Sequence, residues 1–287
     1  MNPDVIPAYI VTTSKSRLYH SDAVKESVES GVIKRMKTIY PSYSPKDGSI
    51  KIFVRVADDR VTISLDSSGD PLYCRGYKTM ISDAPLRENI ASAILLHYNL
   101  NDFDEIIDPM CGTGTFLLES LIQLQVKNHC GLRSFSFENW PVFSEATFNY
   151  IQKKHLAESQ KTTVKITGSD ISAKNIDCCK KNLENLHGEH TTDSVTFYQA
   201  DFFNLRKMSE KLLVVINPPY GKRIETDSSL NDFYIKIGNK LKKDFKGAEC
   251  AIIVPGIEAE KALGLRYTSK IPFMNGGLPV AVLYLTV

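Results

Sequence analysis

From residue 83 onward the sequence alternates short apolar runs with segments of helical spacing, and this alternation restricts the fold more than any other feature. A first strand is expected to end at 106–108, and further strands are expected at 164–167, 195–198, 212–216, 250–254 and 278–287. Helices are expected at 115–126, 146–159, 172–186 and 230–243, with a further one opening at residue 83. Strands alternating with helices are typical of a parallel sheet. We therefore expect an α/β fold over residues 81–287.

The first part of the chain differs in pattern and predicts a separate, small α+β domain. A helix is expected over 21–36, because valines recur at every fourth position along one face. Alternating apolar residues at 50–56 and 61–65 flank a short turn and predict a β-hairpin. The chain is therefore expected to hold two domains, residues 1–80 and 81–287.

Arg75, Tyr77 and Lys78 bring cations and an aromatic ring together in the segment that follows the hairpin. Cations bind phosphates and aromatic rings stack on bases, so this mixture is typical of RNA-binding surfaces. The alternative is a solvated connector between the two domains. Both interpretations stay open at this point, and under the first these three side chains contact RNA.

The net charge, the cysteine pattern and the apolar runs of the chain indicate whether it is a strongly basic, a metal-binding or a membrane protein. A formal net charge of +2 is too small to indicate nucleic-acid binding by itself, so an RNA surface has to be a local patch. The six cysteines show neither a CxxC pair nor the spacing of zinc ligands, which indicates reduced thiols and no metal site. We find no signal peptide and no apolar run of membrane-spanning length. We therefore expect a soluble, cytoplasmic protein.

The string DPMCGTGT, residues 108–115, lies where the first strand of the larger domain passes into its helix. Glycine there lets the backbone approach a ligand closely, because a Cβ would collide with it. The loop lacks the third glycine of a dinucleotide fingerprint and the lysine of a P-loop, which argues against a pyrophosphate or triphosphate cradle. The alternative is a tight strand–helix turn. The candidate ligand contacts are Asp108, Pro109, Cys111, Gly112, Gly114 and Thr115.

Two more acids follow the next two strands. Asp170 precedes Ile171 at the end of the second strand, where its carboxylate can accept hydrogen bonds from both hydroxyls of a ribose. Asp201 precedes Phe202 beyond the third strand, where it can meet an adenine amino group beside an aromatic edge. Each acid alone is explained more simply as a helix cap or a turn former. Together with Asp108 they predict one site, because ligands bind beyond the carboxyl ends of parallel strands.

The string NPPY, residues 217–220, follows the apolar strand 212–216. Proline donates no ladder hydrogen bond, so two consecutive prolines end the strand abruptly. Asn217 Oδ1 and the Pro218 carbonyl can then accept the two hydrogens of a planar NH2 group, while Tyr220 stacks on its face. A simple strand-terminating turn is the alternative. The string resembles motif IV of the amino-methyltransferases that use S-adenosylmethionine.

The chain as a whole resembles the THUMP-associated rRNA large-subunit guanine-N2 methyltransferases. The matching strings are RLYHSDAV (17–24), VRVADDRVTISLDSSGDPLYCRGYK (54–78), APLRENIASAIL (84–95), DPMCGTGTFLLES (108–120), FSFENWPVF (135–143), GSDIS (168–172), NPPYGKRI (217–224) and LGLRYTSKIPFMNGG (263–277). They follow the family's order. The resemblance implies a Rossmann-like class I methyltransferase sheet of seven strands with the last one reversed. It also implies S-adenosylmethionine as the cofactor and a guanine of rRNA turned out into the pocket.

The resemblance further implies roles for individual residues. The implied contacts are Asp108, Gly112, Asp170 and Asp201 for the cofactor, and Asn217, Pro218 and Tyr220 for the target base. We expect Asn217 to contact both ligands. Lys222 and Arg223, just past the motif, are candidates to hold a phosphate of the substrate strand, with a solvated loop as the alternative.

The chain departs from the family's pattern at its N-terminus. Members usually carry a longer RNA-binding region before the string at 17–24, and here only about the second half of the THUMP region is present. A second subunit or another protein is therefore expected to complete the short domain. Two other enzyme classes share NPPY, namely N6-adenine DNA methyltransferases and glutamine methyltransferases that act on release factors. A catalytically idle RNA-binding or scaffold protein is the non-enzyme alternative.

Overall fold

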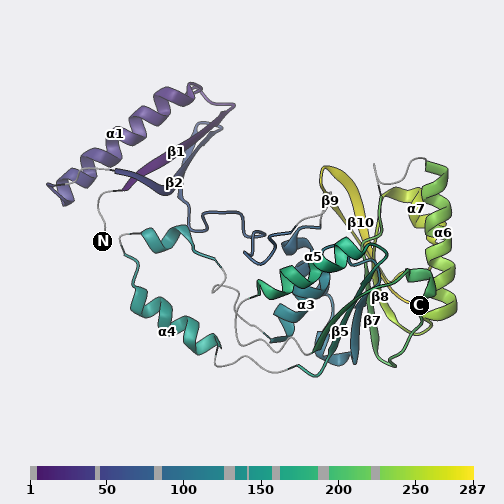
Figure 1. Ribbon diagram of the computed structural model, residues 1–287. Helices are drawn as coiled ribbons and strands as arrows, with labels where there is room; N and C mark the ends of the chain where they lie inside the picture. The colour runs from purple at the N-terminus through teal and green to yellow at the C-terminus, as the bar shows by residue number, and fades with distance from the viewer. Residues whose placement is uncertain are drawn as a thin grey trace. The chain divides into compact units, whose positions relative to one another are not determined.

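The computed structural model describes residues 5–42, 46–80, 86–125, 133–140, 142–156, 162–186, 194–220 and 227–287. The chain forms two compact units, whose elements are labelled in Figure 1. The smaller holds Met1–Leu72 and Arg133–Lys154, and the larger holds Tyr73–Leu132 and His155–Val287. This division differs from the boundary expected at residue 80, because residues 73–80 belong to the larger unit and 133–154 to the smaller.

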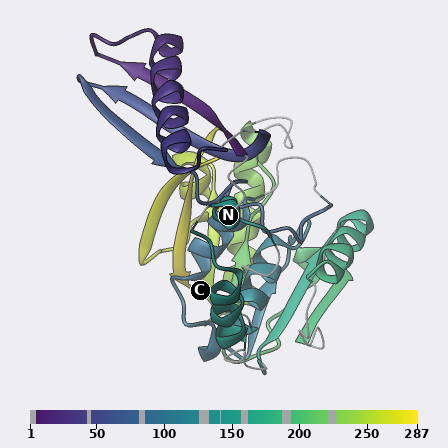
Figure 2. The same ribbon diagram turned by 90° about the vertical axis from the view of Figure 1, so that its left-hand side faces the viewer.

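The smaller unit is a three-stranded sheet with a helix across one face. β1 (Val5–Ser14) runs parallel to β2 (Lys46–Ala57), which pairs antiparallel with β3 (Arg60–Leu65). Figures 1 and 2 show α1 (Ser21–Ile39) lying alongside the strands of this sheet. The side chains that pack between helix and sheet are Val24, Val28, Val32, Tyr9, Val11, Ile52, Val54 and Val56.

The predicted helix and hairpin of this unit are confirmed, whereas β1 was not predicted. Asp58 and Asp59 both adopt positive φ, 51° and 59°, as the two-residue turn of a twisted hairpin requires. β1 pairs with β2 through partners far apart in the sequence, such as Thr12 and Arg55. Because short-range periodicity does not reveal a pairing between distant segments, the sequence pattern did not predict this strand.

Hydrogen bonds to the segment just beyond β3 explain why residues 133–154 belong to the smaller unit. The segment contains the short helix η3 (Ser136–Asn139) and most of α4 (Glu145–Leu156). Trp140 Nε1 donates to the carbonyl of Asp66, just beyond β3, at 3.2 Å. The rings in mutual contact are Phe135, Phe137, Trp140, Phe143 and Phe148. The expected insertion is therefore a packed part of the smaller unit.

The larger unit is built on a seven-stranded sheet in the order β6-β5-β4-β7-β8-β10-β9. The strands are β4 (Glu105–Asp108), β5 (Lys165–Asp170), β6 (Val195–Gln199), β7 (Leu212–Ile216), β8 (Glu249–Val254), β9 (Ser269–Asn275) and β10 (Leu278–Thr286). β10 runs antiparallel to both β8 and β9, and the remaining neighbours are parallel. The predicted α/β sheet with its last strand reversed is therefore confirmed.

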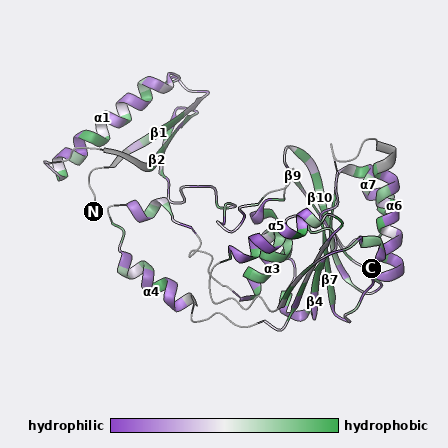
Figure 3. Cartoon of the chain, in the orientation of Figure 1, coloured by the Kyte–Doolittle hydropathy of each residue, from purple (hydrophilic) through white to green (hydrophobic). Residues whose placement is uncertain are grey.

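Helices cover both faces of this sheet. They are α2 (Glu88–Leu95), α3 (Thr115–Gln125), α5 (Ala173–Glu184), α6 (Asp227–Asp244) and α7 (Gly256–Leu263). α2, α3 and α5 share one core cluster with Val215 and Ile253, whereas α6 and α7 share a second with Val214 and Ile252. Successive strand residues thus enter opposite cores, which explains the continuous apolar runs. Figure 3 shows apolar residues concentrated along these strands and the helices beside them.

Neither α7 nor β9 was predicted. β9 contains Pro272, which lacks a backbone donor and is tolerated because β9 is an edge strand. α7 follows β8 after a short turn and packs closely on α6, where a Cβ on Gly238 would lie 1.9 Å from the Leu263 carbonyl oxygen. Among the helices of the described ranges, none combines the length and apolarity needed to cross a bilayer.

Candidate active site

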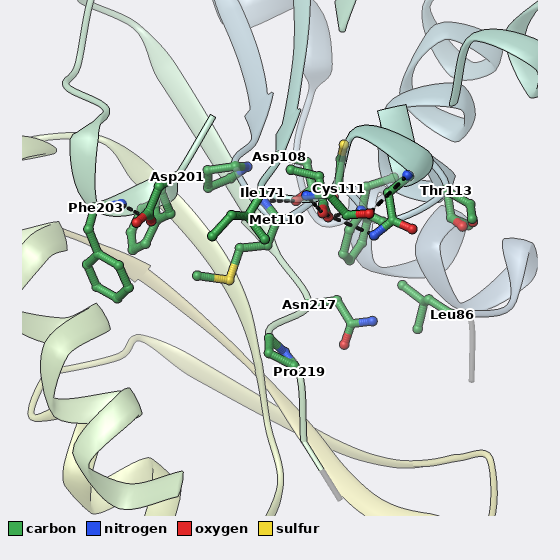
Figure 4. Close-up of a pocket in the computed structure, with 18 of the residues that line it drawn as sticks. Leu86, Asp108, Met110, Cys111, Thr113, Ile171, Asp201, Phe203, Asn217 and Pro219 are labelled. Atoms are coloured by element: carbon green, nitrogen blue, oxygen red, sulfur yellow. Dashed lines mark hydrogen bonds between the residues drawn. The ribbon is translucent and has the colours of Figure 1, made fainter. Parts of the chain in front are cut away.

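A cavity of about 540 Å³ lies in the larger unit, at the carboxyl ends of the parallel strands (Figure 4). The predicted residues that line it are Asp108, Pro109, Cys111, Gly112, Thr115, Asp170, Ile171, Asp201, Phe202 and Asn217. The lining residues that were not predicted are Leu86, Met110, Thr113, Phe116, Ser172, Asn175, Phe203, Pro219 and Phe233. Most of the second group are neighbours of predicted residues in the same loops. Phe233 comes from α6, and no sequence signal pointed to it.

The loop after β4 is shaped by glycine. Gly112 adopts φ +55°, and a Cβ placed on it would meet no atom within 4 Å, so open space adjoins its backbone. The Gly112 N–H donates to Asp170 Oδ2 at 2.9 Å, which joins the loop to the end of β5. Gly114 is not among the lining residues, and its Cβ would lie 3.2 Å from Cys179 Sγ. The structure therefore gives Gly114 a packing role, and the expected ligand contact stays a prediction.

Asp170 accepts hydrogen bonds on both of its carboxylate oxygens. Its Oδ1 accepts from the Ser172 N–H at 2.9 Å and from Asn175 Nδ2 at 3.0 Å, and its Oδ2 accepts from Gly112. A carboxylate offers about four acceptor positions. The acceptor position that remains, on Oδ2, suits one ligand hydroxyl, whereas the sequence had suggested two.

Asp108 is a buried carboxyl group in the wall of this cavity. Its side chain accepts from the Met110 N–H at 3.1 Å, and the residue is 2% exposed. Burial raises the pKa of Asp108 well above its ordinary value, the charge of Asp170 raises it further, and the Met110 hydrogen bond opposes both. A cationic ligand group beside Asp108 would favour the ionised form. The site is therefore suited to an ammonium or a sulphonium.

The other end of the cavity is apolar and aromatic. Asp201 Oδ1 accepts from the Phe203 N–H at 3.0 Å and so caps the short helix η5 (Phe202–Asn204). The rings of Phe203 and Phe233 meet edge to face, with centroids 6.2 Å apart. Asp201 thus acts as a cap, as the simpler interpretation held, and also lines the cavity. Aromatic surface beside a carboxylate suits a flat ring that carries an amino group.

Asn217 places an unsatisfied acceptor in the cavity. Its Oδ1 is buried and accepts no hydrogen bond from the residues that the structure describes. Figure 4 shows the side chain projecting into the space near Leu86 and Pro219. A buried amide oxygen without a donor costs about 1–3 kcal/mol. A hydrogen-bond donor from a bound ligand would therefore satisfy Asn217 Oδ1.

The remaining residues of the NPPY string lie differently. Pro218 and Tyr220 are not among the lining residues, although Pro219 between them is. The Tyr220 ring packs against the first core cluster, and its hydroxyl oxygen accepts from Asn275 Nδ2 at 2.6 Å. The roles expected for Pro218 and Tyr220 stay predictions. Lys222 and Arg223 fall outside the described residues.

The RNA contacts expected at Arg75, Tyr77 and Lys78 are replaced by structural roles. Arg75 Nε and Nη2 donate to the two carboxylate oxygens of Glu119, each at 3.2 Å, and the Tyr77 hydroxyl donates to Glu119 Oε1 at 2.9 Å. Tyr77 is fully buried, so its ring has no face to offer a base. Lys78 Nζ donates to Thr115 Oγ1 at 2.8 Å and to a backbone carbonyl at 2.9 Å.

These contacts also explain the position of the unit boundary. α3, through Glu119 and Thr115, holds the segment 73–80 against the larger unit. Asn182 of α5 adds two bonds to the backbone of Met80, at 3.0 and 3.1 Å. Burial lowers the pKa of Lys78, and the nearby carboxylates of Glu88 and Glu119 oppose this.

Within the described residues, we find no cluster of His, Cys, Asp or Glu that fits a metal ion.

The order of the sheet, its one reversed strand and the cavity at the carboxyl ends together define a Rossmann-like methyltransferase fold. The crystal structure of SMU.472 complexed with SAH has this fold: its TM-score is 0.85 at 24% identity, over 98% of this chain and 75% of that one. The family model of the RMKL-like methyltransferase domain (UPF0020) matches residues 75–282. The chain belongs to this family.

Curated relatives agree with that assignment. A protein of Synechocystis sp. named "Putative RNA methyltransferase slr0064" is 30% identical over 277 residues, which are 95% of this chain and 71% of that protein. The "Ribosomal RNA large subunit methyltransferase K/L" of Shewanella oneidensis is 30% identical over 247 residues, which are 84% of this chain and 34% of that protein. The chain thus spans only about a third of the Shewanella relative.

Proposed function

We propose that the chain transfers a methyl group from S-adenosylmethionine to the exocyclic N2 amine of a guanine in RNA, with large-subunit rRNA as the substrate. Membership of the RMKL-like family supports methyl transfer. The names of the relatives from Synechocystis and Shewanella support an RNA substrate. The smaller unit is proposed to dock that RNA.

One observation carries the choice of an amine as the target. Asn217 Oδ1 is a buried acceptor without a donor in the described residues, and it follows β7 directly at the cavity. An NH2 group supplies the missing donor and leaves its second hydrogen for the neighbouring Pro218 carbonyl. A hydroxyl or thiol target has one hydrogen and would satisfy one of these acceptors only.

The cavity suits S-adenosylmethionine in volume and in chemistry. About 540 Å³ falls within the usual range of small-molecule sites. Asp108 would hold the ammonium, Asp170 Oδ2 one ribose hydroxyl, and Asp201 with Phe202 the adenine. When bound, the cofactor supplies a methyl group that its sulphonium has already activated.

The protein's part in the reaction is alignment and charge stabilisation. Asn217 and the Pro218 carbonyl orient the amine so that its lone pair faces the methyl group. The same two oxygens stabilise the positive charge that develops on nitrogen as the bond forms. Tyr220 is proposed to lie against the flat face of the base, and Lys222 and Arg223 to hold a substrate phosphate.

The test is methyl transfer from labelled S-adenosylmethionine to large-subunit rRNA made by transcription, which carries no prior modification. Digestion to nucleosides then identifies the methylated base. Labelled N2-methylguanosine is the expected product. Labelled N6-methyladenosine would agree with methylation of an exocyclic amine, and it would show that the target base is adenine and not guanine. No label on RNA, together with a labelled glutamine in a parallel reaction on a release factor, would overturn the RNA substrate.

A further inference from the structure

A residue far along the chain from NPPY makes a direct contact with its tyrosine. Asn275, the last residue of β9, donates from Nδ2 to the Tyr220 hydroxyl oxygen at 2.6 Å. Asn275 is 6% exposed. It lies in the string at 263–277, which the proposed function leaves without a role. The bond therefore links the β9–β10 hairpin to the strand end that carries Asn217.

The hairpin holds the Asn275 backbone firmly. Asn275 pairs with Leu278 across the turn, and Gly276 and Gly277 between them adopt φ of +58° and +83°. Positive φ at both central residues is the geometry of a tight two-residue hairpin turn. Phe273 of β9 packs against the same core cluster as Tyr220. The Asn275 side chain is thus presented from a fixed position.

We infer that Asn275 is a positioning residue for the target base and acts through Tyr220. The inference rests on the proposed function, because it assumes that the Tyr220 ring contacts the base. A tyrosine ring has two rotatable torsions, and a stacking surface is useful only when its plane is set before the base arrives. Core packing supports one part of the ring, and the Asn275 amide fixes the hydroxyl at the other end.

Loss of the contact between Asn275 and Tyr220 is expected to weaken RNA binding and to leave cofactor binding unchanged. Loss of the bond removes one of the contacts that fix the Tyr220 ring, so part of its ordering falls on the binding step and RNA affinity decreases. The cofactor contacts of Asp108, Asp170 and Asp201 lie at other strand ends and are untouched. A merely structural role for Asn275 would instead lower the unfolding temperature and weaken both ligands together.

The experiment is a double-mutant cycle on the full chain with Asn275→Leu, Tyr220→Phe and the two combined. Leucine matches asparagine in size and removes the donor, and phenylalanine removes the acceptor. Steady-state methyl transfer to transcribed large-subunit rRNA gives KM and kcat, and titration with S-adenosylhomocysteine gives the cofactor-site affinity. Asn239→Leu, at an exposed position of α6, is the matched control.

Each single variant is expected to raise the KM for RNA about 3–10-fold, as for loss of one hydrogen bond, with little change in kcat. The double variant is expected to be no worse than the more affected single one, and S-adenosylhomocysteine affinity to stay within twofold of wild type. Multiplying effects in the double variant, or an unchanged KM in Asn275→Leu, overturns the inference. A wild-type protein that labels no RNA overturns the proposed function instead.

Discussion

Asp170 Oδ2 accepts a hydrogen bond of 2.9 Å from the backbone N–H of Gly112, so the carboxylate at the end of β5 holds the loop that follows β4. The same carboxylate accepts from the Ser172 N–H at the start of α5. Two neighbouring strand ends and one helix start are therefore fixed by a single side chain. Asp170 therefore organises this part of the cavity wall.

Replacement of Asp170 by alanine should weaken binding of S-adenosylhomocysteine by about 10–150-fold. Removal of a charge-assisted hydrogen bond costs about 1.5–3 kcal/mol, and 1.4 kcal/mol is a factor of ten in affinity. The variant loses the acceptor of the Gly112 N–H, so the loop has to be ordered when the ligand binds. Isothermal titration calorimetry measures the change.

The control for this prediction is Asp177→Ala, which removes an exposed carboxylate from α5, the helix that follows Asp170. Its affinity for S-adenosylhomocysteine should match that of the wild type. Equal affinities for the Asp170 and Asp177 variants would show that the carboxylate at the end of β5 takes no part in cofactor binding.

Asp108→Asn should stabilise the ligand-free protein at neutral pH and weaken S-adenosylhomocysteine about 10–150-fold. The pKa of Asp108 is raised by burial, so its contribution to stability is complete below the ordinary value of 3.8 and is lost as pH rises through the raised pKa. Asparagine has the same shape and does not titrate. The advantage of the variant in unfolding temperature should therefore grow from pH 4 upward.

Thermal unfolding at several pH values, with and without ligand, checks this prediction. A variant less stable than the wild type throughout the pH range would contradict it. An unchanged affinity of the variant for S-adenosylhomocysteine would also contradict the prediction, because a group other than Asp108 would then bind the ammonium.

The parts of the site that the sequence could predict are those carried by residues next to a strand end. Asp108, Asp170 and Asn217 each lie within three residues of the end of a strand that the sequence predicts, and parallel topology brings such ends to one edge of the sheet. Phe233 reaches the cavity from α6, a helix whose placement depends on packing across the sheet. No local pattern encodes that approach.

The composition of the segment 73–80 did not predict that its charged residues are buried. Arg75, Tyr77 and Lys78 have the composition of an RNA surface, and the structure places them against α3. The signal that identifies this burial is Glu119, a carboxylate inside the apolar helix Thr115–Gln125. A buried acid requires a cation and hydrogen-bond donors, and the segment 73–80 supplies them.

Arg75→Met should destabilise the larger unit by about 3–5 kcal/mol, because it leaves the fully buried Glu119 carboxylate without its cation. Burial already raises the pKa of Glu119 and Arg75 opposes that shift, so the variant raises the pKa further. Stability linked to a raised carboxyl pKa is lost as pH rises through it. Both proteins lose this stability from the ordinary value of 4.5 upward, so the deficit of the variant should grow only once pH exceeds the raised pKa of Glu119 in the wild type.

Chemical denaturation at acidic and neutral pH measures this deficit. The matched control is Lys261→Met, which breaks an ion pair with Glu258 whose side chains are 72% and 76% exposed. Exposed pairs contribute about 1 kcal/mol or less, so the control should be nearly neutral. A small, pH-independent deficit for Arg75→Met would mean that Glu119 is satisfied without the arginine.

Asn217→Ala should lower methyl transfer about 10²–10³-fold, as for loss of one oriented polar group at a transition state. The same change removes a buried acceptor that has no donor among the described residues, so the ligand-free protein should be no less stable than the wild type. Single-turnover methyl transfer and thermal unfolding measure the two quantities. Asn239→Ala, at an exposed position of α6, is the control for both. Near-wild-type turnover would show that the amide does not orient the amine, whereas lost turnover with lost stability would show a structural role.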